Sequence, residues 1–218
     1  MLLELLRTSP LLFALLFSSL VMALVLHELA HGLAALAFGD DTAKRAGRLT
    51  LNPLAHLDPL GTLLLLIAGF GWARPVPVNP FRLRPYRLGL FVVSIAGVVV
   101  NLVLALAGAF LFKALFYADP TAFYAAERGI YTLTGSLAVL ALYFSSINLV
   151  LAVFNLLPVP PLDGSKVVAS LLPLRLHPWF WRLERYSWVG FLLLVTVLRE
   201  PIFRFIDWSH RVFFGAVF

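Results

Sequence analysis

Residues 9–38 form one long apolar segment, SPLLFALLFSSLVMALVLHELAHGLAALAF. A helix of about 20 apolar residues crosses a bilayer, and this one is about 45 Å long at 1.5 Å per residue. That length exceeds a hydrocarbon core of about 30 Å, so we expect the helix to tilt or protrude. The segment is also longer than the apolar part of a signal peptide, and Glu4 balances Arg7 ahead of it. It therefore predicts a retained transmembrane helix that ends near Gly39 and Asp40.

Two further segments have the length and composition of membrane spans, residues 88–117 and 133–154. Residues 60–71 are apolar but too short to cross a bilayer, so they predict a re-entrant or buried segment. Residues 186–198 and 201–218 are also apolar and are separated by a short polar break. This pattern indicates one broken span or two half-spans at the C-terminal end.

The segments between these spans are richer in polar and turn-forming residues. Residues 72–87 carry four prolines, which exclude a continuous helix, and we expect a short extended or β segment near 72–80. Residues 118–132 predict a short loop. The sequence thus predicts an all-α polytopic membrane protein, with about four to six transmembrane or re-entrant helices in a single domain over 1–218.

The composition supports a membrane protein. Hydrophobic residues make up 61% of the chain and charged residues 13%, whereas soluble domains average about 25% charged residues. This excludes an intrinsically disordered chain and an ordinary soluble enzyme. A net charge of +6 is also found in proteins that bind nucleic acid, but in a membrane protein basic loops set orientation and meet anionic lipid. We therefore expect the lipid bilayer as a partner, and no nucleic acid.

The basic residues predict an orientation in the membrane. Lys and Arg gather in residues 39–87 and 157–185, whereas residues 118–132 hold only Arg128. The positive-inside rule then places the first two regions in the cytoplasm and the third outside. The N-terminus would also lie outside.

The first apolar segment contains an H-E-x-x-H motif, from His27 to His31. Residues four apart lie one turn apart on one face of a helix, so both imidazoles can bind one Zn²⁺. Glu28 lies beside them, where it can reach a water rather than the metal. Ionisable groups at membrane depth cost a few kcal/mol each, which favours a functional site over a buried polar cluster.

A catalytic zinc ion takes three protein ligands and keeps one position open. The chain has no cysteine, so the third ligand must be His, Asp or Glu. Asp40 and Asp41 lie about 14 Å beyond His31 along the same helix, too far to close the site. Glu127 falls in the outer loop. Asp163, at the cytoplasmic end of the third span, is the first candidate, and His56 is the second.

A second motif, Asn155-Leu156-Leu157-Pro158-Val159-Pro160-Pro161-Leu162-Asp163-Gly164, follows the third span. Its pattern is N-x-x-P-x-x-x-x-D-G, and together with H-E-x-x-H it resembles the site-2 protease family of intramembrane zinc metalloproteases. Residues 47–80 also look like the compact bacterial and archaeal branch, which has no PDZ domain, and the resemblance covers about residues 20–172. One departure is Val98, which stands where the family's A-G-P-x-x-N motif has proline, so the usual cause of a helix kink is missing there.

The resemblance implies one Zn²⁺ per chain, bound by His27, His31 and Asp163. It implies that Glu28 is the catalytic acid/base and that Asn155 binds substrate or stabilises the developing oxyanion. The protein would then be a zinc-dependent intramembrane endopeptidase that hydrolyses peptide bonds of transmembrane protein substrates near the cytoplasmic side. The expected location is the inner membrane of a prokaryotic cell.

Three residues of the proline-rich segment are candidates for substrate binding, namely Val76, Val78 and Asn79. An extended substrate is often held by strand addition, and this segment could present the required edge. The catalytic core would cover about residues 9–172, followed by C-terminal membrane segments over 186–218.

Two polar residues within the spans also need an explanation. We expect Asn101 and Asn148 to form hydrogen bonds between helices, and Asn148, two turns before Asn155, could also line the same cavity.

Two other functions are compatible with the metal-ligating residues, a metal-binding transporter and an inactive membrane scaffold that binds helices. Transporters tend to show repeated halves with paired broken helices, and no such repeat is seen in this sequence. Glu28 would be dispensable for transport and essential for proteolysis. An intact set of ligands together with a base argues against a scaffold.

Overall fold

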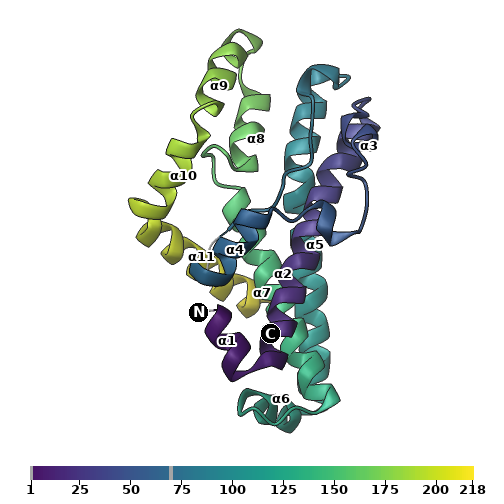
Figure 1. The fold of residues 1–218 in the computed structure, drawn as a ribbon, viewed down its shortest axis with the longest axis vertical. Coiled ribbons are helices and arrows are strands. Elements are labelled where there is room, and N and C mark those ends of the chain that lie inside the picture. Colours follow the sequence, from purple (N-terminus) through teal and green to yellow (C-terminus); the bar gives the residue numbers. More distant parts are fainter. Residues whose placement is uncertain (1, 69–70) are drawn as a thin grey trace.

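The computed structural model describes residues 2–68 and 71–218, and these are mostly helical (Figure 1). The α-helices are α1 (Leu2–Thr8), α2 (Pro10–Ala37), α3 (Thr42–Arg45), α4 (Pro59–Ala68), α5 (Tyr86–Ala118), α6 (Pro120–Glu127), α7 (Leu133–Asn155), α8 (Asp163–Leu171), α9 (His177–Glu184), α10 (Ser187–Thr196) and α11 (Arg199–Val217). Three short 3₁₀ helices are η1 (Pro53–Ala55), η2 (Pro80–Arg82) and η3 (Leu174–Leu176). The described residues contain no β-strand, so the all-α prediction is confirmed.

Three of these helices, α2, α5 and α7, are long and apolar enough to cross a membrane. They coincide closely with the three spans predicted from the apolar segments. Helix α5 packs against both α2 and α7, and the three form the bundle at the centre of the molecule (Figure 1). Helix α5 also runs without interruption through Val98, in agreement with the missing proline. The length and composition of the three helices are those of a multi-pass membrane protein.

The connection between α5 and α7 contains a helix, where the sequence had predicted only a loop over 118–132. The side chain of Asp119 accepts a hydrogen bond of 3.0 Å from the backbone N–H of Ala122, and Pro120 occupies the first helical position. These are standard signals for a helix start, and they produce α6. The prediction of a loop was therefore wrong for Pro120–Glu127.

The proline-rich segment that follows α4 forms no helix over residues 71–79, as its prolines predicted, and Asn79 has extended backbone angles. Its β pairing is limited to one isolated antiparallel bridge between Leu57 and Ala73. Pro75 and Pro77 have no backbone N–H, so they cannot donate to a β-ladder. The segment is therefore not a strand, and we call residues 71–79 the strap.

Two carboxylates accept hydrogen bonds from backbone N–H groups of this strap. The backbone N–H of Val76 donates to Oε2 of Glu28 at 2.7 Å, and the N–H of Asn79 donates to Oδ2 of Asp40 at 2.6 Å. Asp40 is fully buried just beyond the end of α2. The strap is thus attached both to the middle of α2 and to its C-terminal end.

Helix α4 is the short apolar segment for which the sequence predicted a re-entrant or buried position. Leu60, Leu63 and Ile67 are each more than half exposed, so this helix is not buried within the protein. Residues 69–70 of the predicted segment lie outside the described residues. The helix is too short to be a span, as expected from its sequence.

Helices α8 to α11 form an arm: α8 packs against α5, α9 and α10 lead away from the bundle, and α11 returns to it (Figure 1). The break between α10 and α11 falls at residues 197–198, whereas the sequence suggested a break at 199–201. Those three residues instead form the first turn of α11, where proline is tolerated. Lys113 of α5 donates a hydrogen bond of 2.6 Å to the carbonyl of Val217, which ties the end of α11 to the bundle.

Candidate metal centre

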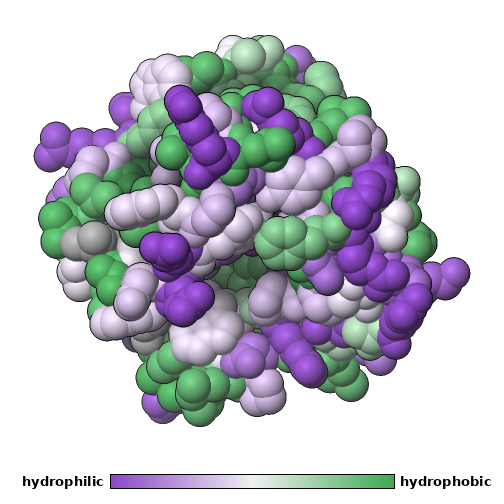
Figure 2. Space-filling view, turned by 90° about the horizontal axis from the view of Figure 1, so that it is seen from above, coloured by the Kyte–Doolittle hydropathy of each residue, from purple (hydrophilic) through white to green (hydrophobic). Residues whose placement is uncertain are grey.

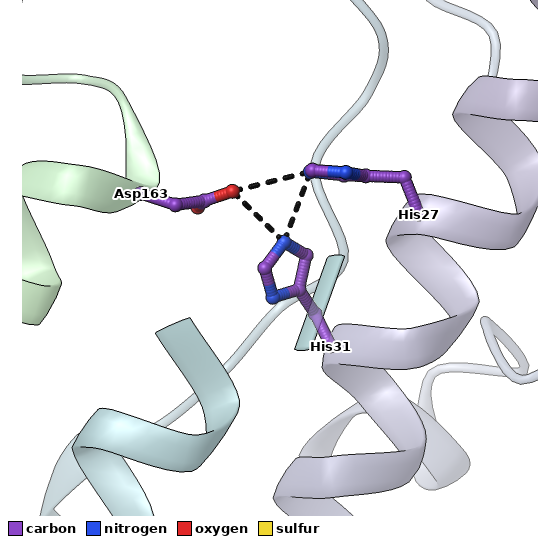
Figure 3. Close-up of side chains that lie close together, drawn as sticks. All are labelled: His27, His31 and Asp163. Carbon is purple, nitrogen blue, oxygen red and sulfur yellow. Dashed lines mark hydrogen bonds and ion pairs between the residues drawn. The ribbon is translucent and has the colours of Figure 1, made fainter. Parts of the chain in front are cut away.

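His27, His31 and Asp163 lie together with their side chains pointing toward one another (Figure 3). The Nε2 atoms of the two histidines are 3.0 Å apart, and each lies 3.1 Å from Oδ2 of Asp163. All three residues are buried. The structure therefore brings together, from α2 and α8, the three residues that the sequence predicted as metal ligands.

The geometry and chemistry of this group fit a zinc ion. Bonds of about 2.0–2.2 Å in a tetrahedral site place neighbouring ligand atoms about 3.3–3.6 Å apart, a few tenths of an ångström more than the separations found here. Two imidazoles and one carboxylate form a donor set typical of catalytic zinc sites, which leave a fourth position for water or substrate. The three ligand atoms are nearly equidistant, so a single ion can contact all of them.

Local sequence explains how Asp163 reaches the histidines. Residues 156–162 are not helical, because their prolines remove the donors that a regular helix needs. Helix α8 then starts at Asp163. A Cβ atom on Gly164 would lie 2.2 Å from the carbonyl oxygen of Leu156, so only glycine allows α8 to start this close to the end of α7.

Gly97 of α5 lies directly against the two histidines. A Cβ atom at this position would be 2.5 Å from Cε1 of His27 and 2.5 Å from Nε2 of His31. No real Cβ fits at such distances, so the glycine allows α5 to approach the metal-binding face of α2. Gly97 was not among the site residues predicted from the sequence. A small residue in the middle of a span was the available signal, but its partner helix could not be known.

Each histidine has a hydrogen-bond acceptor on the ring nitrogen that faces away from the group. Nδ1 of His27 lies 2.5 Å from Oδ1 of Asn101, and Nδ1 of His31 lies 2.6 Å from the carbonyl oxygen of Val93. Such partners orient metal-binding histidines and fix which nitrogen carries the proton. Both rings therefore present Nε2 to the shared centre.

A cavity of about 540 Å³ opens beside the three ligands. Glu28 lies in its wall, next to His27 in the sequence, with its carboxylate held by the N–H of Val76. Asn155 also lines the cavity, and its Nδ2 donates to the carbonyl of Leu151 at 3.0 Å. The two residues that the sequence predicted as catalytic thus share one cavity with the metal-binding group.

The strap forms another wall of this cavity through Val76 and Val78. Asn79, the third residue predicted to bind substrate, is placed differently. Its side chain accepts a hydrogen bond of 3.1 Å from the N–H of Phe81 and caps η2. The structure therefore brings two of the three predicted substrate-binding residues to the cavity.

Helices α8 and α9 supply cavity residues that the sequence analysis missed, namely Lys166, Trp181 and Glu184. Nζ of Lys166 lies 3.9 Å from Oε1 of Glu184. Burial raises the pKa of the Glu184 carboxyl above its usual value, and the positive charge of Lys166 opposes that effect. These residues lie within 157–185, a region that the sequence predicted to be cytoplasmic from its basic side chains, with no role in the site.

Two other candidates lie away from the centre. His56, the second candidate for the third ligand, is fully buried, and its Nε2 lies 2.8 Å from the carbonyl oxygen of Thr50. It is not part of the metal-ligating group found among the described residues. Asn148 does not line the cavity but forms a hydrogen bond with Asn101, so its expected role between helices is confirmed.

Comparison with known proteins identifies the family. The model of peptidase family M50 matches residues 13–198. The chain belongs to peptidase family M50. It is 44% identical over 193 residues to YwhC of Bacillus subtilis, covering 87% of this chain and 82% of that protein. It is 33% identical over 215 residues to Rip2 of Mycolicibacterium smegmatis, covering 94% of this chain and 72% of the relative.

Both M50 relatives carry names that describe zinc metalloproteases. No solved structure matches the chain. The predicted resemblance to site-2 proteases is confirmed, and the protein is a zinc metalloprotease whose three long apolar helices fit an intramembrane enzyme.

Proposed function

We propose that this M50 protease cleaves transmembrane protein substrates within the bilayer, with zinc held by His27, His31 and Asp163. The observation that carries the proposal is the buried triangle of three ligand atoms beside a cavity that also contains Glu28. Zinc, when bound, supplies Lewis acidity that polarises the scissile carbonyl and makes water a nucleophile near neutral pH. The chain's own residues supply the remaining functions.

Glu28 serves as the acid/base. A carboxylate in this position takes a proton from the attacking water and returns it to the leaving amine. The hydrogen bond from Val76 to Oε2 restricts the rotation of the carboxylate and keeps it at the cavity wall. Glu28 is therefore oriented by the same strap that lines the cavity.

Asn155 and the strap position the substrate. The Asn155 amide group has two N–H donors. One is used by the carbonyl of Leu151, and the other can donate to the oxyanion that develops on the substrate. An extended substrate segment lies along the strap near Val76 and Val78, where main-chain hydrogen bonds hold it as in strand addition. The prolines of the strap limit its donors, so it contributes mainly carbonyl acceptors.

The site lies toward the cytoplasmic side of the membrane. His31 is about 9 Å along α2 from the end of the helix at Ala37. The segments that follow this end contain most of the basic residues that predict a cytoplasmic face. Figure 2 views the molecule from this end and shows hydrophilic side chains gathered around a hollow. In a prokaryotic cell this orientation corresponds to the inner membrane.

The test is cleavage of a labelled transmembrane substrate by the purified protein reconstituted in lipid vesicles. We expect Glu28→Gln to retain zinc and to lose activity by about 10²–10⁴-fold, because it removes the acid/base and leaves the ligands in place. Glu127→Gln is the matched control, since Glu127 is exposed in α6 and far along the chain from the site. Cleavage by Glu28→Gln at the wild-type rate would refute the proposed mechanism.

The same experiment separates proteolysis from metal transport and from a scaffold function. A transporter or a scaffold would release no fragment from the substrate, and Glu28→Gln would leave its function intact. Full zinc occupancy in a His27→Ala variant would show that the proposed ligand set is wrong.

A further inference from the structure

Two buried asparagines connect His27 to the far side of the helical bundle. Asn101 lies on α5 and Asn148 on α7, and neither side chain is exposed to solvent. Nδ2 of Asn101 donates a hydrogen bond of 2.7 Å to Oδ1 of Asn148, and Nδ2 of Asn148 donates one of 2.8 Å to the carbonyl of Phe144. With the contact between Asn101 and His27, these bonds form one continuous chain across α2, α5 and α7.

This hydrogen-bond chain has a fixed direction because it ends at the backbone carbonyl of Phe144. The carbonyl of Phe144 can only accept, so Asn148 must turn its NH₂ group toward it. The oxygen of Asn148 then faces Asn101, and Asn101 must turn its own NH₂ group toward that oxygen. The oxygen of Asn101 is left facing His27. Reversing both amides would place two acceptors in contact at Phe144, in a buried site where an unpaired polar group is costly.

The direction of this hydrogen-bond chain determines which ring nitrogen of His27 carries the proton. An amide oxygen at 2.5 Å from Nδ1 requires the proton to be on Nδ1. Nε2 then carries the lone pair, and Nε2 is the atom that lies 3.1 Å from Asp163. We propose that Asn101 and Asn148 are positioning residues that fix the tautomer of His27, so that its Nε2 is ready to bind zinc. This inference depends on the proposed function only in taking His27 as a zinc ligand.

His31 does not need a comparable arrangement. Its Nδ1 lies 2.6 Å from the backbone carbonyl of Val93, which is an acceptor in every state. The amide of Asn101, in contrast, could face His27 with either its oxygen or its NH₂ group. Asn148 removes this ambiguity, so its role extends beyond holding two helices together.

Ser145 offers a matched control for the purely structural role. It is fully buried one turn before Asn148 on α7, and its hydroxyl donates a hydrogen bond of 2.7 Å to the carbonyl of Ala105 on α5. Ser145→Ala therefore removes one buried hydrogen bond between α5 and α7 and leaves the hydrogen-bond chain that ends at His27 unchanged.

The experiment measures the zinc affinity of the purified full chain in detergent, by competition with a chromophoric chelator. We expect Asn101→Leu to weaken zinc binding by about 10–100-fold, the usual effect of losing the partner of a metal-binding histidine. Asn148→Leu should weaken it by about 3–10-fold, because Asn101 keeps its place but loses its fixed direction. Ser145→Ala should leave the affinity unchanged.

A second measurement reads the tautomer directly. Ring-nitrogen NMR of the ¹⁵N-histidine-labelled apo-protein at pH 8, with His27 assigned by comparison with His27→Ala, should show Nδ1 protonated in the wild type. Asn148→Leu should show a mixture of the two tautomers. If Asn101→Leu does not fold, as judged by thermal unfolding, Asn148→Leu and the NMR measurement still decide the question.

The possible outcomes are distinct. Wild-type affinity in both Asn101→Leu and Asn148→Leu, or an equal loss in Asn148→Leu and Ser145→Ala, would overturn the positioning role. Unchanged zinc binding in His27→Ala would instead refute the ligand set of the proposed function. Loss of zinc in His27→Ala with no effect of either asparagine would leave the ligand set intact and exclude this inference alone.

Discussion

The backbone N–H of Val76 donates a hydrogen bond of 2.7 Å to Oε2 of Glu28. Val76 is flanked by Pro75 and Pro77, neither of which has an N–H, so it carries the single backbone donor of this tripeptide. The residue is buried and lies in the wall of the cavity. The strap that lines the cavity therefore also orients the acid/base proposed for the reaction.

The first prediction concerns this donor. Val76→Pro removes the N–H, and we expect kcat to fall by about 10–100-fold, because a hydrogen bond to a charged group contributes about 1.5–3 kcal/mol. Zinc content should not change, since the hydrogen bond that is removed ends on Glu28 and not on a residue of the proposed ligand set. The measurement is kcat for a reconstituted transmembrane substrate, together with zinc content. Val76→Ala keeps the N–H and is the control, so an equal loss of kcat in both variants would exclude the role of the hydrogen bond.

The second prediction concerns the close approach of α5 to the histidines. Gly97→Ala places a methyl group 2.5 Å from both His27 and His31, and one of the helices must move. Overpacking of this kind costs about 1–3 kcal/mol, which corresponds to about 5–150-fold in zinc affinity if it falls on the bound geometry. Zinc titration of the purified protein measures this effect.

Gly215 provides the matched control for Gly97→Ala. It also lies within a helix, α11, but a Cβ atom there would meet no atom within 4 Å. Gly215→Ala should therefore leave zinc affinity unchanged and increase stability by up to about 1 kcal/mol through helix propensity. Equal zinc affinities in the two variants would show that the space beside Gly97 is not required.

Hydropathy and two motifs were sufficient to predict the helices and ligands that depend on local sequence. The bundle of α2, α5 and α7 follows from the length of three apolar segments, and the metal-binding group follows from residues at characteristic spacings. Helix α6 was missed, although Asp119 followed by Pro120 is a local start signal. That error was avoidable, because the information lay within two adjacent residues.

Other features could not be read from the sequence, because they depend on which helices meet. Gly97 is 66 positions from His31, and only the packing of α5 on α2 shows that a side chain there would collide with the ligands. The β pairing expected near 72–80 is limited for a similar reason. The donors of Val76 and Asn79 are taken by carboxylates on or just after α2, and nothing in the local pattern indicates this.

The third prediction concerns the third zinc ligand. Asp163→Ala removes one corner of the triangle, so we expect zinc affinity to fall by more than the 10–100-fold or so that is typical of residues outside the ligand set. His56→Ala should not change zinc affinity, because its ring contacts the carbonyl of Thr50 and does not line the cavity. Zinc content by atomic absorption after dialysis distinguishes the two variants. A larger loss in His56→Ala than in Asp163→Ala would reverse this assignment.

The fourth prediction concerns the attachment of the C-terminal arm. Lys113 lies on α5, and its ammonium group donates to the carbonyl of Val217 and also lies 5.7 Å from the ring centre of Phe218. Lys113→Met keeps most of the apolar stem but removes the charge. Because hydrogen bonds to charged groups contribute about 1.5–3 kcal/mol, we expect a loss of stability of this order.

Arg211→Met on α11 is the control for Lys113→Met. Arg211 forms an exposed ion pair with Asp207 at 3.5 Å, one turn away on the same helix, and such a pair contributes only about 0.3–0.5 kcal/mol. Thermal unfolding in detergent should therefore show a clear decrease of the midpoint for Lys113→Met and almost none for Arg211→Met. If the midpoint falls equally in both variants, α11 is held by its apolar contacts with the bundle and not by the charge of Lys113.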